Sequence, residues 1–487
     1  MNLIKISIHP ENKKVGQLQF FRNDVEDSKA LKKLRNSDVF KKYNSVRNHV
    51  KPKFRKSIPM FLYAITEKGF FRIGLLADIF KHCSEYFPSF DFDVEPSFEK
   101  EYEPSFPLPM NFKLYNFNNF VYRDVQEEAL MRIFTRGRGI IEVGTAGGKG
   151  LIMASVIKTI HEYNSSFSFT VVVPTHLIIK TIEEFKNEYG IESITGWGQG
   201  LKPDFSKKVL IVGPHALARQ KNLENIDRNV CMIDECHIVK QGSGLIKIID
   251  RYIETPNVIG FTGTISDETE DKWCCVGAIG KIIYKVPSQE LKQKGFKTHS
   301  KVVGIKILKH RFKKTEKDSY PNENEYLINS KERNDLITNF TLKACKKNTL
   351  IPIEFDIQQQ NLLDSFEGKT DRKILVIDGD VNPEDRQKYY EDLESDDDSI
   401  VIAKVGCMRE GISINNLHFL VLPLIRKSFI RISQFIGRVE RKHDDKEVAI
   451  IYDFFDDTFH SNRHFKKRME IYKKEQIPYK TIGVNLI

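Results

Sequence analysis

Three short motifs in a fixed order constrain this chain more than any other feature of its sequence. The first is Val143-Gly144-Thr145-Ala146-Gly147-Gly148-Lys149-Gly150, the second Asp234-Glu235-Cys236-His237, and the third runs from Gln434 to Arg441. They supply, in turn, glycines with a lysine, two adjacent carboxylates and a late pair of arginines. In this order they predict a two-lobed protein driven by a nucleoside triphosphate.

The composition is that of a globular protein with more than one domain. The chain has 487 residues, of which 40% are hydrophobic, and a single core rarely serves that length. Its net charge of +10 suits a polyanionic partner without proving one. The seven cysteines form no C-x-x-C pair, which favours a reducing compartment. No apolar run is long enough for a membrane span and the first residues do not resemble a signal peptide, so we expect a cytoplasmic protein without a membrane partner.

Short apolar runs alternate with helical stretches, which predicts parallel α/β sheets. The first set is 139–143, 169–173, 209–212, 230–233 and 258–261, and the second set is 350–355, 373–377, 399–403, 419–422 and 448–452. A proline-containing acidic segment, 93–109, predicts a linker after a small N-terminal domain. We therefore expect an α/β chain with a small α+β accessory domain and linker at 1–108, one lobe at 109–296, a second at 297–460 and a basic C-terminal helix and tail at 461–487.

The first motif has the context of a phosphate-binding loop. It joins a predicted strand to a predicted helix, where backbone N–H groups and Lys149 can bind phosphate oxygens. The residue after the lysine is Gly150, which has no hydroxyl to bind Mg²⁺. Either water fills that position or metal affinity and turnover are reduced, and replacing Gly150 with Ser is expected to raise one of them.

The second motif follows a predicted apolar strand, so its acids lie at the carboxyl end of a sheet, where ligands bind. Asp234 can hold Mg²⁺, and Glu235 can contribute to the same metal site and orient or deprotonate the attacking water. His237 is placed to link the nucleotide to the second lobe.

The third motif is predicted to lie on a helix. Gln434, Arg438 and Arg441 are spaced three or four residues apart and share one face, which can meet a phosphate tail. An arginine in this role stabilises charge in the transition state.

These motifs resemble those of superfamily 2 helicases of the DExH type, and further matches cover most of residues 120–445. The resemblance implies two tandem RecA-like lobes, ATP and Mg²⁺ as cofactors, and the following roles. Tyr122, Arg123 and Gln126 belong to an adenine-reading motif; Pro174, Thr175, Gly213, His215, Gly379 and Lys404 would lie near nucleic-acid phosphates; Thr262, Gly263 and Thr264 would couple hydrolysis to lobe movement; Gly411 and Ser413 would lie close to the nucleotide.

More narrowly, the chain resembles UvsW-type phage helicases. The Asp-Glu-Cys-His box, the run Gly411–His418 and the run Phe71–Leu76 carry this resemblance. It implies an ATPase that unwinds branched or forked DNA and migrates junctions in phage recombination and replication, in the host cytoplasm, with single-stranded DNA and phage recombination or single-strand-binding proteins as partners. We expect a monomer. A weakly catalytic or non-catalytic ATP-binding clamp and an RNA helicase remain open alternatives.

A basic stretch in the N-terminal domain adds a candidate nucleic-acid surface. Residues 41–56 interleave seven basic side chains, among them Lys51, Lys53 and Arg55, with Tyr43 and Phe54. This composition can contact phosphates and stack on a base.

Overall fold

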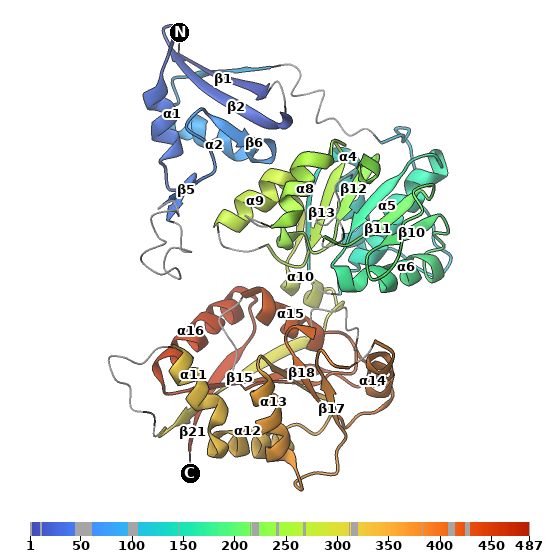
Figure 1. Cartoon of the computed structure of the whole chain (residues 1–487), viewed down its shortest axis with the longest axis vertical. Helices are drawn as coiled ribbons and strands as arrows, with labels where there is room; N and C mark the ends of the chain where they lie inside the picture. The colour runs from blue at the N-terminus through green and yellow to red at the C-terminus, as the bar shows by residue number, and fades with distance from the viewer. Residues whose placement is uncertain are drawn as a thin grey trace. The chain divides into compact units, whose positions relative to one another are not determined.

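The structure is a computed structural model. It describes residues 2–9, 12–43, 61–95, 106–144, 146–214, 216, 224–239, 243–265, 269–310, 312, 320–381, 383–407, 414–423 and 429–486. The chain divides into two compact units (Figure 1). The first contains Met1–Val143 and Gly148–Lys285, and the second contains Val286–Ile487 together with Gly144–Gly147.

The first unit begins with a small mixed α+β domain. Its strands follow the order β3-β2-β1-β7, with β6 also paired to β2; β1 and β2 are antiparallel, whereas β1 and β7 are parallel. The elements are β1 (Asn2–His9), β2 (Asn12–Arg22), β3 (Val25–Glu26), α1 (Ser28–Arg35), β4 (Lys41–Tyr43), β5 (Phe61–Tyr63), β6 (Phe70–Arg72), η3 (Ile73–Leu75), α2 (Leu76–Tyr86) and β7 (Asp91–Val94). The predicted linker thus overlaps β7 at its start, and its residues 96–105 lie outside the described part of the chain.

The rest of the first unit is an α/β lobe. Its elements are α4 (Asp124–Arg136), β8 (Gly139–Val143), α5 (Lys149–Tyr163), β9 (Phe169–Val172), η4 (Thr175–Leu177), α6 (Ile178–Asn187), β10 (Ile194–Trp197), β11 (Val209–Val212), η5 (Glu224–Ile226), β12 (Val230–Ile233), η6 (Cys236–Ile238), α8 (Gly244–Tyr252), β13 (Val258–Thr262), α9 (Thr269–Ile279) and β14 (Ile282–Val286). The strand order among the described residues is β10-β11-β9-β12-β13-β8-β14, and the pairs from β10 through β8 are parallel. Figure 1 shows α8 and α9 on one side of this sheet and α5 and α6 on the other.

The strands of this lobe are buried along their whole length at the centre of the sheet. Every residue of β8, β9, β11 and β12 is buried, because helices cover both faces and leave no strand face for water. The five apolar runs predicted for the first lobe are therefore confirmed as strands. The edge strands β10 and β14 were not predicted, since each mixes polar with apolar residues.

The small domain and this lobe share one hydrophobic core. A single cluster of buried side chains runs from Ile4 and Phe71 of the small domain to Cys236 and Ile279 of the lobe. At the junction, a Cβ placed on Gly74 would lie 2.0 Å from the carbonyl oxygen of Val276 in α9. Only a glycine allows the backbones to approach this closely. The run Phe71–Leu76 is thus the face with which the small domain packs on α9.

The second unit is another α/β lobe. Its elements are α10 (Ser288–Gln293), β15 (His299–Leu308), α11 (Tyr320–Asn329), α12 (Lys331–Ala344), β16 (Thr349–Ile353), α13 (Asp356–Phe366), β17 (Ile374–Ile377), α14 (Pro383–Ser395), β18 (Ile400–Lys404), β19 (Phe419–Leu422), α15 (Phe429–Val439), β20 (Val448–Asp456), α16 (Phe459–Lys474) and β21 (Tyr479–Asn485). The described strands form a parallel sheet in the order β17-β18-β16-β19-β20-β15-β21.

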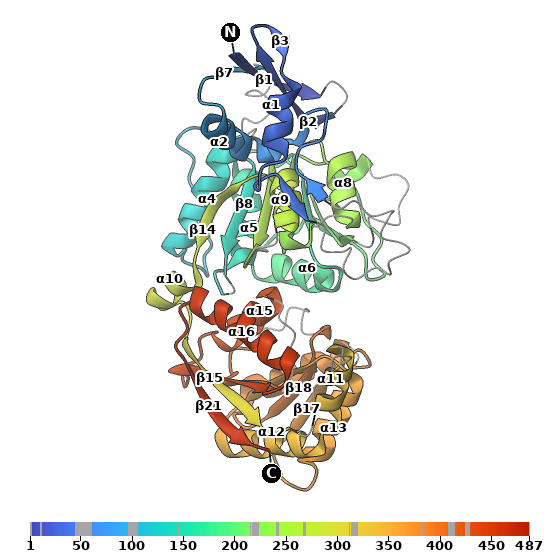
Figure 2. The same ribbon diagram turned by 90° about the vertical axis from the view of Figure 1, so that its left-hand side faces the viewer.

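The C-terminal segment differs from the predicted helix and tail. The helix α16 is present, but β21 follows it and pairs with β15 from Val302 to Leu308, so the last residues belong to the second sheet (Figure 2). Neither β15 nor β21 was predicted, because both alternate polar and apolar residues and lie near the edge of the sheet.

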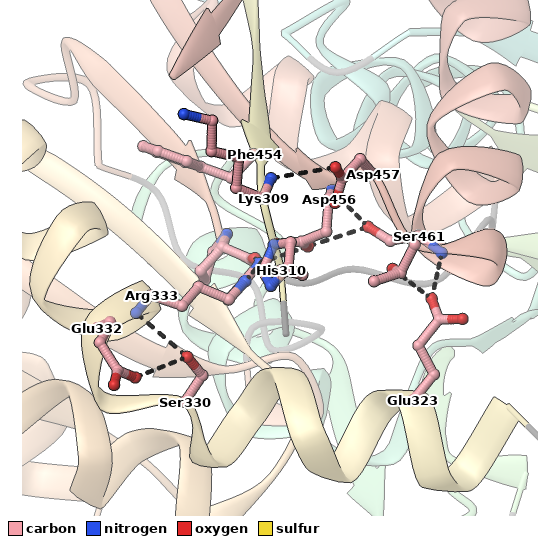
Figure 3. Close-up of polar contacts among 12 residues, drawn as sticks. Lys309, His310, Glu323, Ser330, Glu332, Arg333, Phe454, Asp456, Asp457 and Ser461 are labelled. Carbon is pink, nitrogen blue, oxygen red and sulfur yellow. Dashed lines mark hydrogen bonds and ion pairs between the residues drawn. The ribbon is translucent and has the colours of Figure 1, made fainter. Parts of the chain in front are cut away.

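Buried polar contacts fix the helices of this lobe to its sheet and to one another. Arg333 of α12 contacts Asp456 at the end of β20 through two bonds, Nε to Oδ1 at 2.7 Å and Nη2 to Oδ2 at 3.0 Å (Figure 3). Glu323 of α11 accepts hydrogen bonds from the backbone N–H groups of His460 and Ser461 in the first turn of α16. A carboxylate at this position satisfies unpaired N–H groups and complements the helix dipole.

Candidate functional site

The phosphate loop leaves β8 and enters α5 through residues with left-handed backbone. Ala146 has φ of 68° and Gly148 has φ of 78°, and the N–H of Gly147 donates to the carbonyl of Gly144 at 3.0 Å. Lys149 is the first residue of α5, so the first turn of this helix, whose N–H groups have no partner within the helix, begins where the loop ends. This geometry fits an anionic ligand. Thr145 lies outside the described residues.

Gln126 lies beside this loop. Its Oε1 accepts a hydrogen bond from the N–H of Arg123 at 2.9 Å, at the start of α4. A Cβ on Gly148 would lie 2.1 Å from Gln126 Nε2, so the amide packs directly on the loop. The hydroxyl of Tyr122 donates to the carbonyl of Tyr115, 2.7 Å away, and lies 3.0 Å from Ser155 Oγ, which anchors the ring between the preceding segment and α5. Burial lowers the pKa of Arg123.

Lys149 contacts the acidic box, Asp234 and Glu235, at the carboxyl edge of the sheet. Its Nζ lies 2.9 Å from Glu235 Oε1, and both side chains are largely buried. Burial alone would lower the pKa of Lys149, but the charges of Glu235 and Asp234 raise it. Burial would likewise raise the pKa of Glu235, but Lys149 and His237 hold it well below its usual range. The lysine and Glu235 are therefore both charged.

Asp234 has a different environment from its neighbour. Its backbone N–H donates to the carbonyl of Val172, which fixes it at the end of β12, and its Oδ1 accepts from the N–H of Glu235. Burial raises the pKa of Asp234 to about 6, although Lys149 opposes this shift. A bound divalent cation would keep this carboxylate ionised. Carboxylate oxygens beside a phosphate loop fit the ligands that Mg²⁺ prefers.

His237 joins the acidic box to the turn after β13. Its Nδ1 lies 3.1 Å from Glu235 Oε2 and 3.0 Å from Thr262 Oγ1. The hydroxyl of Thr262 donates to the carbonyl of Thr264, so it can accept the Nδ1 hydrogen of His237. Gly263 lies between the two threonines. A continuous line of polar contacts thus runs from Lys149 through Glu235 and His237 to Thr262.

Cys236 packs on the opposite side, away from this polar line. It is fully buried, and the thiol of Cys275 in α9 donates to its backbone carbonyl at 3.3 Å. The same helix α9 packs against the small domain through Val276. These contacts give Cys236 a packing role.

The predicted nucleic-acid residues of the first lobe lie together. Thr175 begins η4 directly after Pro174, and a Cβ on Gly213 would lie 2.6 Å from Thr175 Oγ1. This hydroxyl is buried and has no hydrogen-bond partner among the described residues. Buried hydroxyls are normally paired, so Thr175 departs from the usual pattern at a position predicted to lie near nucleic-acid phosphates. His215 lies outside the described residues.

The arginine motif lies in the second unit and departs from a single helix face. Arg438 is on α15 and is buried, whereas α15 ends at Val439, so Arg441 follows it in a turn. Arg441 Nη1 is buried without a hydrogen-bond partner among the described residues, and burial lowers the pKa of its guanidinium. Gln434 is half-buried on the same helix. The contribution of these three residues to a nucleotide site stays a prediction.

Sequence reasoning missed the carboxylate between the two arginines. Glu440 is 1% exposed; its Oε1 lies 2.6 Å from Lys292 Nζ, and its Oε2 lies 2.9 Å from Lys297 Nζ. The Ser300 hydroxyl also donates to Oε1 at 2.6 Å. These contacts tie the arginine motif to α10 and to the start of β15. No local pattern signals them, because the partners are about 140 residues apart.

The remaining predicted residues that the structure describes, Gly379 and Lys404, lie in the second unit. Lys404 forms an ion pair with Asp356 at the start of α13, and Gly379 has open space where a side chain would project. Gly411, Ser413, Lys51, Lys53 and Arg55 lie outside the described residues. In the part of the chain that the structure describes, no helix is long and apolar enough to cross a membrane.

Comparison with known proteins supports the helicase resemblance that the motifs carry. Residues 119–267 match the family described as the type III restriction enzyme res subunit. The ATP-dependent DNA helicase uvsW of Enterobacteria phage T4 is 26% identical over 343 residues, which cover 68% of each chain.

Solved structures share the fold. The ATP-dependent type ISP restriction-modification enzyme LlaBIII bound to DNA aligns with a TM-score of 0.58 at 13% identity, over 75% of this chain and 32% of its own. Dbp5 of S. cerevisiae bound to RNA and ADP BeF3 aligns with a TM-score of 0.52 at 16% identity, over 74% of this chain and 89% of its own. The two sheets are therefore tandem RecA-like lobes, as predicted.

Proposed function

We propose that this chain, a superfamily 2 DExH protein of the UvsW type, is an ATP-dependent DNA helicase. The observation that carries the proposal is the polar line from Lys149 through Glu235 and His237 to Thr262, because it joins a phosphate-binding lysine to the acidic box and to the turn that follows β13. A relative with 26% identity over two thirds of this chain has that activity.

Residues of the first lobe can be assigned to each step of ATP hydrolysis. Lys149 and the loop N–H groups bind the β- and γ-phosphates of ATP, which removes Lys149 from Glu235. Glu235 is then free to orient or deprotonate the attacking water. Mg²⁺, held by Asp234 with Glu235, would neutralise charge that develops on the phosphates. His237 and Thr262 sense the change at Glu235 because they contact it directly or through one residue.

Strand contacts complete the proposal. Thr175 offers an unpartnered hydroxyl, and Pro174 and Gly213 place backbone beside it, so this edge of the lobe can bind the phosphates of a DNA strand. Arg438 and Arg441 would stabilise the transition state from the second lobe, and Tyr122, Arg123 and Gln126 would read the adenine. Branched or forked DNA in phage recombination and replication is the substrate that we infer from the UvsW resemblance.

The test is phosphate release with and without forked DNA, together with strand separation of forked DNA, four-way junctions and RNA duplexes. Lys149→Ala should abolish DNA-stimulated hydrolysis and nucleotide binding, whereas Lys186→Ala, an exposed lysine on α6, should leave both unchanged. Unchanged turnover of Lys149→Ala would refute the site. Nucleotide binding without turnover in the unaltered protein would instead establish the clamp, and separation of RNA alone would establish an RNA helicase.

A further inference from the structure

The position after the phosphate-loop lysine is filled by a side chain from another helix. A Cβ placed on Gly150 would lie 2.5 Å from Glu184 Oε1 and 3.5 Å from its carboxyl carbon. Atoms that are not bonded do not approach this closely. The carboxylate of Glu184 therefore occupies the space into which a serine or threonine at position 150 would project.

The structure holds this carboxylate in place. Glu184 lies in the last turn of α6, next to Phe185, which is fully buried. The Tyr189 hydroxyl donates to Glu184 Oε1 at 3.1 Å, and the ring of Tyr189 packs edge-on against Phe117 at 5.8 Å. Because Tyr189 is itself 93% buried, it is a rigid support for the acid.

We propose that Glu184 replaces the missing hydroxyl of the phosphate loop and supplies an oxygen ligand to Mg²⁺. This rests on the proposed function, since it needs a nucleotide on Lys149. Carboxylate oxygens are good ligands for Mg²⁺, and Oε1 stands within about a bond length or two of the position that a hydroxyl at residue 150 would take.

The arrangement fits the way proteins bind this ion. Mg²⁺ is held by one or two carboxylates and takes its other ligands from phosphates and water. Accordingly, no group of three His, Cys, Asp or Glu side chains in the described residues can hold a metal ion alone. In this arrangement Asp234 and Glu184 are the two carboxylate ligands and the nucleotide completes the site, which leaves Glu235 to orient the water.

The decisive measurement is the affinity for ADP in the presence of Mg²⁺ divided by the affinity in EDTA, obtained by titration calorimetry. Glu184→Gln keeps the size of the side chain and an oxygen for Tyr189 but removes the charge. We expect this ratio to fall about 10-fold or more, the size typical of losing a group that supports a metal site, while the affinity in EDTA is unchanged. Glu183→Gln, the exposed neighbour, is the matched control and should leave the ratio unchanged.

A pair of variants tests the replacement itself. Gly150→Ser alone must displace Glu184, so it should lower the ratio, which reverses the expectation from the sequence. Glu184→Ala together with Gly150→Ser offers a hydroxyl with space around it and should restore the ratio relative to Glu184→Ala. Counting bound Mn²⁺ by electron paramagnetic resonance in the presence of ADP gives an independent readout.

Two results would overturn the proposal. One is a ratio within twofold of the unaltered protein in Glu184→Gln. The other is a double variant no better than Glu184→Ala. Tyr189→Phe keeps the charged acid and removes only its hydrogen bond, so it should lower the ratio less than Glu184→Gln does. If Lys149→Ala still bound ADP normally, the proposed function itself would fail, which this set of measurements distinguishes.

Discussion

The ion cluster around Glu440 gives the sharpest prediction about stability. Glu440 is bonded to Lys292 and Lys297, and all three side chains are at most 3% exposed. Glu440→Leu would leave two buried ammonium groups without their carboxylate. Breaking a buried pair in this way costs about 3–5 kcal/mol, and here both lysines lose the same partner.

The triple variant Lys292→Met, Lys297→Met and Glu440→Leu separates charge from packing. It removes every charge of the triad and keeps the volume, which is often neutral or stabilising by about 1–4 kcal/mol. Glu475 lies near both lysines, but it is half-buried and therefore stays in contact with water when their charges are removed. The triple variant should therefore recover the stability that the single variant loses.

The assay is native-state hydrogen exchange followed by mass spectrometry, read on peptides of α10, β15 and β20. Both tryptophans, Trp197 and Trp273, lie in the first unit, so their fluorescence does not report on this cluster. Equal protection in Glu440→Leu and the unaltered chain would show that the lysines find other partners. A triple variant as unstable as the single one would show that packing, and not charge, decides.

Two further predictions concern other sites. Gly74→Ala should lower the stability of the first unit by about 1–3 kcal/mol, because its Cβ would collide with the carbonyl of Val276. Thermal unfolding measures this loss, and Gly406→Ala, where the space around the residue is open, is the control. An unchanged unfolding midpoint in Gly74→Ala would contradict the prediction. Burial, reinforced by Lys446, lowers the pKa of His418 to about 4, so the unfolded chain binds a proton at higher pH than the folded one. The contribution of neutral His418 to the free energy of unfolding should be fully present above about pH 6.5. That free energy should fall by about 1–3 kcal/mol as the pH is lowered toward 4. Urea unfolding at several pH values should show a flatter profile in His418→Gln, and identical profiles would refute the assignment.

The parts of the fold that the sequence predicted are those governed by local pattern. Apolar runs such as Val209–Val212 became central strands because both faces of the sheet are covered. The meeting of the phosphate loop and the acidic box also followed, because the carboxyl ends of β8 and β12 lie at the same edge of the parallel sheet, with β13 between them. The edge strands escaped prediction since their exposed residues break the apolar pattern.

The parts that the sequence could not predict depend on contacts between distant residues. Glu184 belongs to no motif, and its position beside Gly150 depends on how α6 packs next to the start of α5. Glu440 reads as one more charged residue among arginines until Lys292 and Lys297 are placed around it. Arg441 was assigned to a helix face, but the helix ends before it.

The close packing of Gly74 on α9 limits how the small domain and the first lobe can change during evolution. The small domain and the first lobe have no separate interiors, because one set of buried side chains serves both. Ile73 and Leu75 belong to the same buried cluster as Cys236, so a change at either residue is expected to disturb the packing around Cys236. Substitutions on the two sides of this junction should compensate one another, and exchanging the small domain between relatives should succeed only when α9 is exchanged with it.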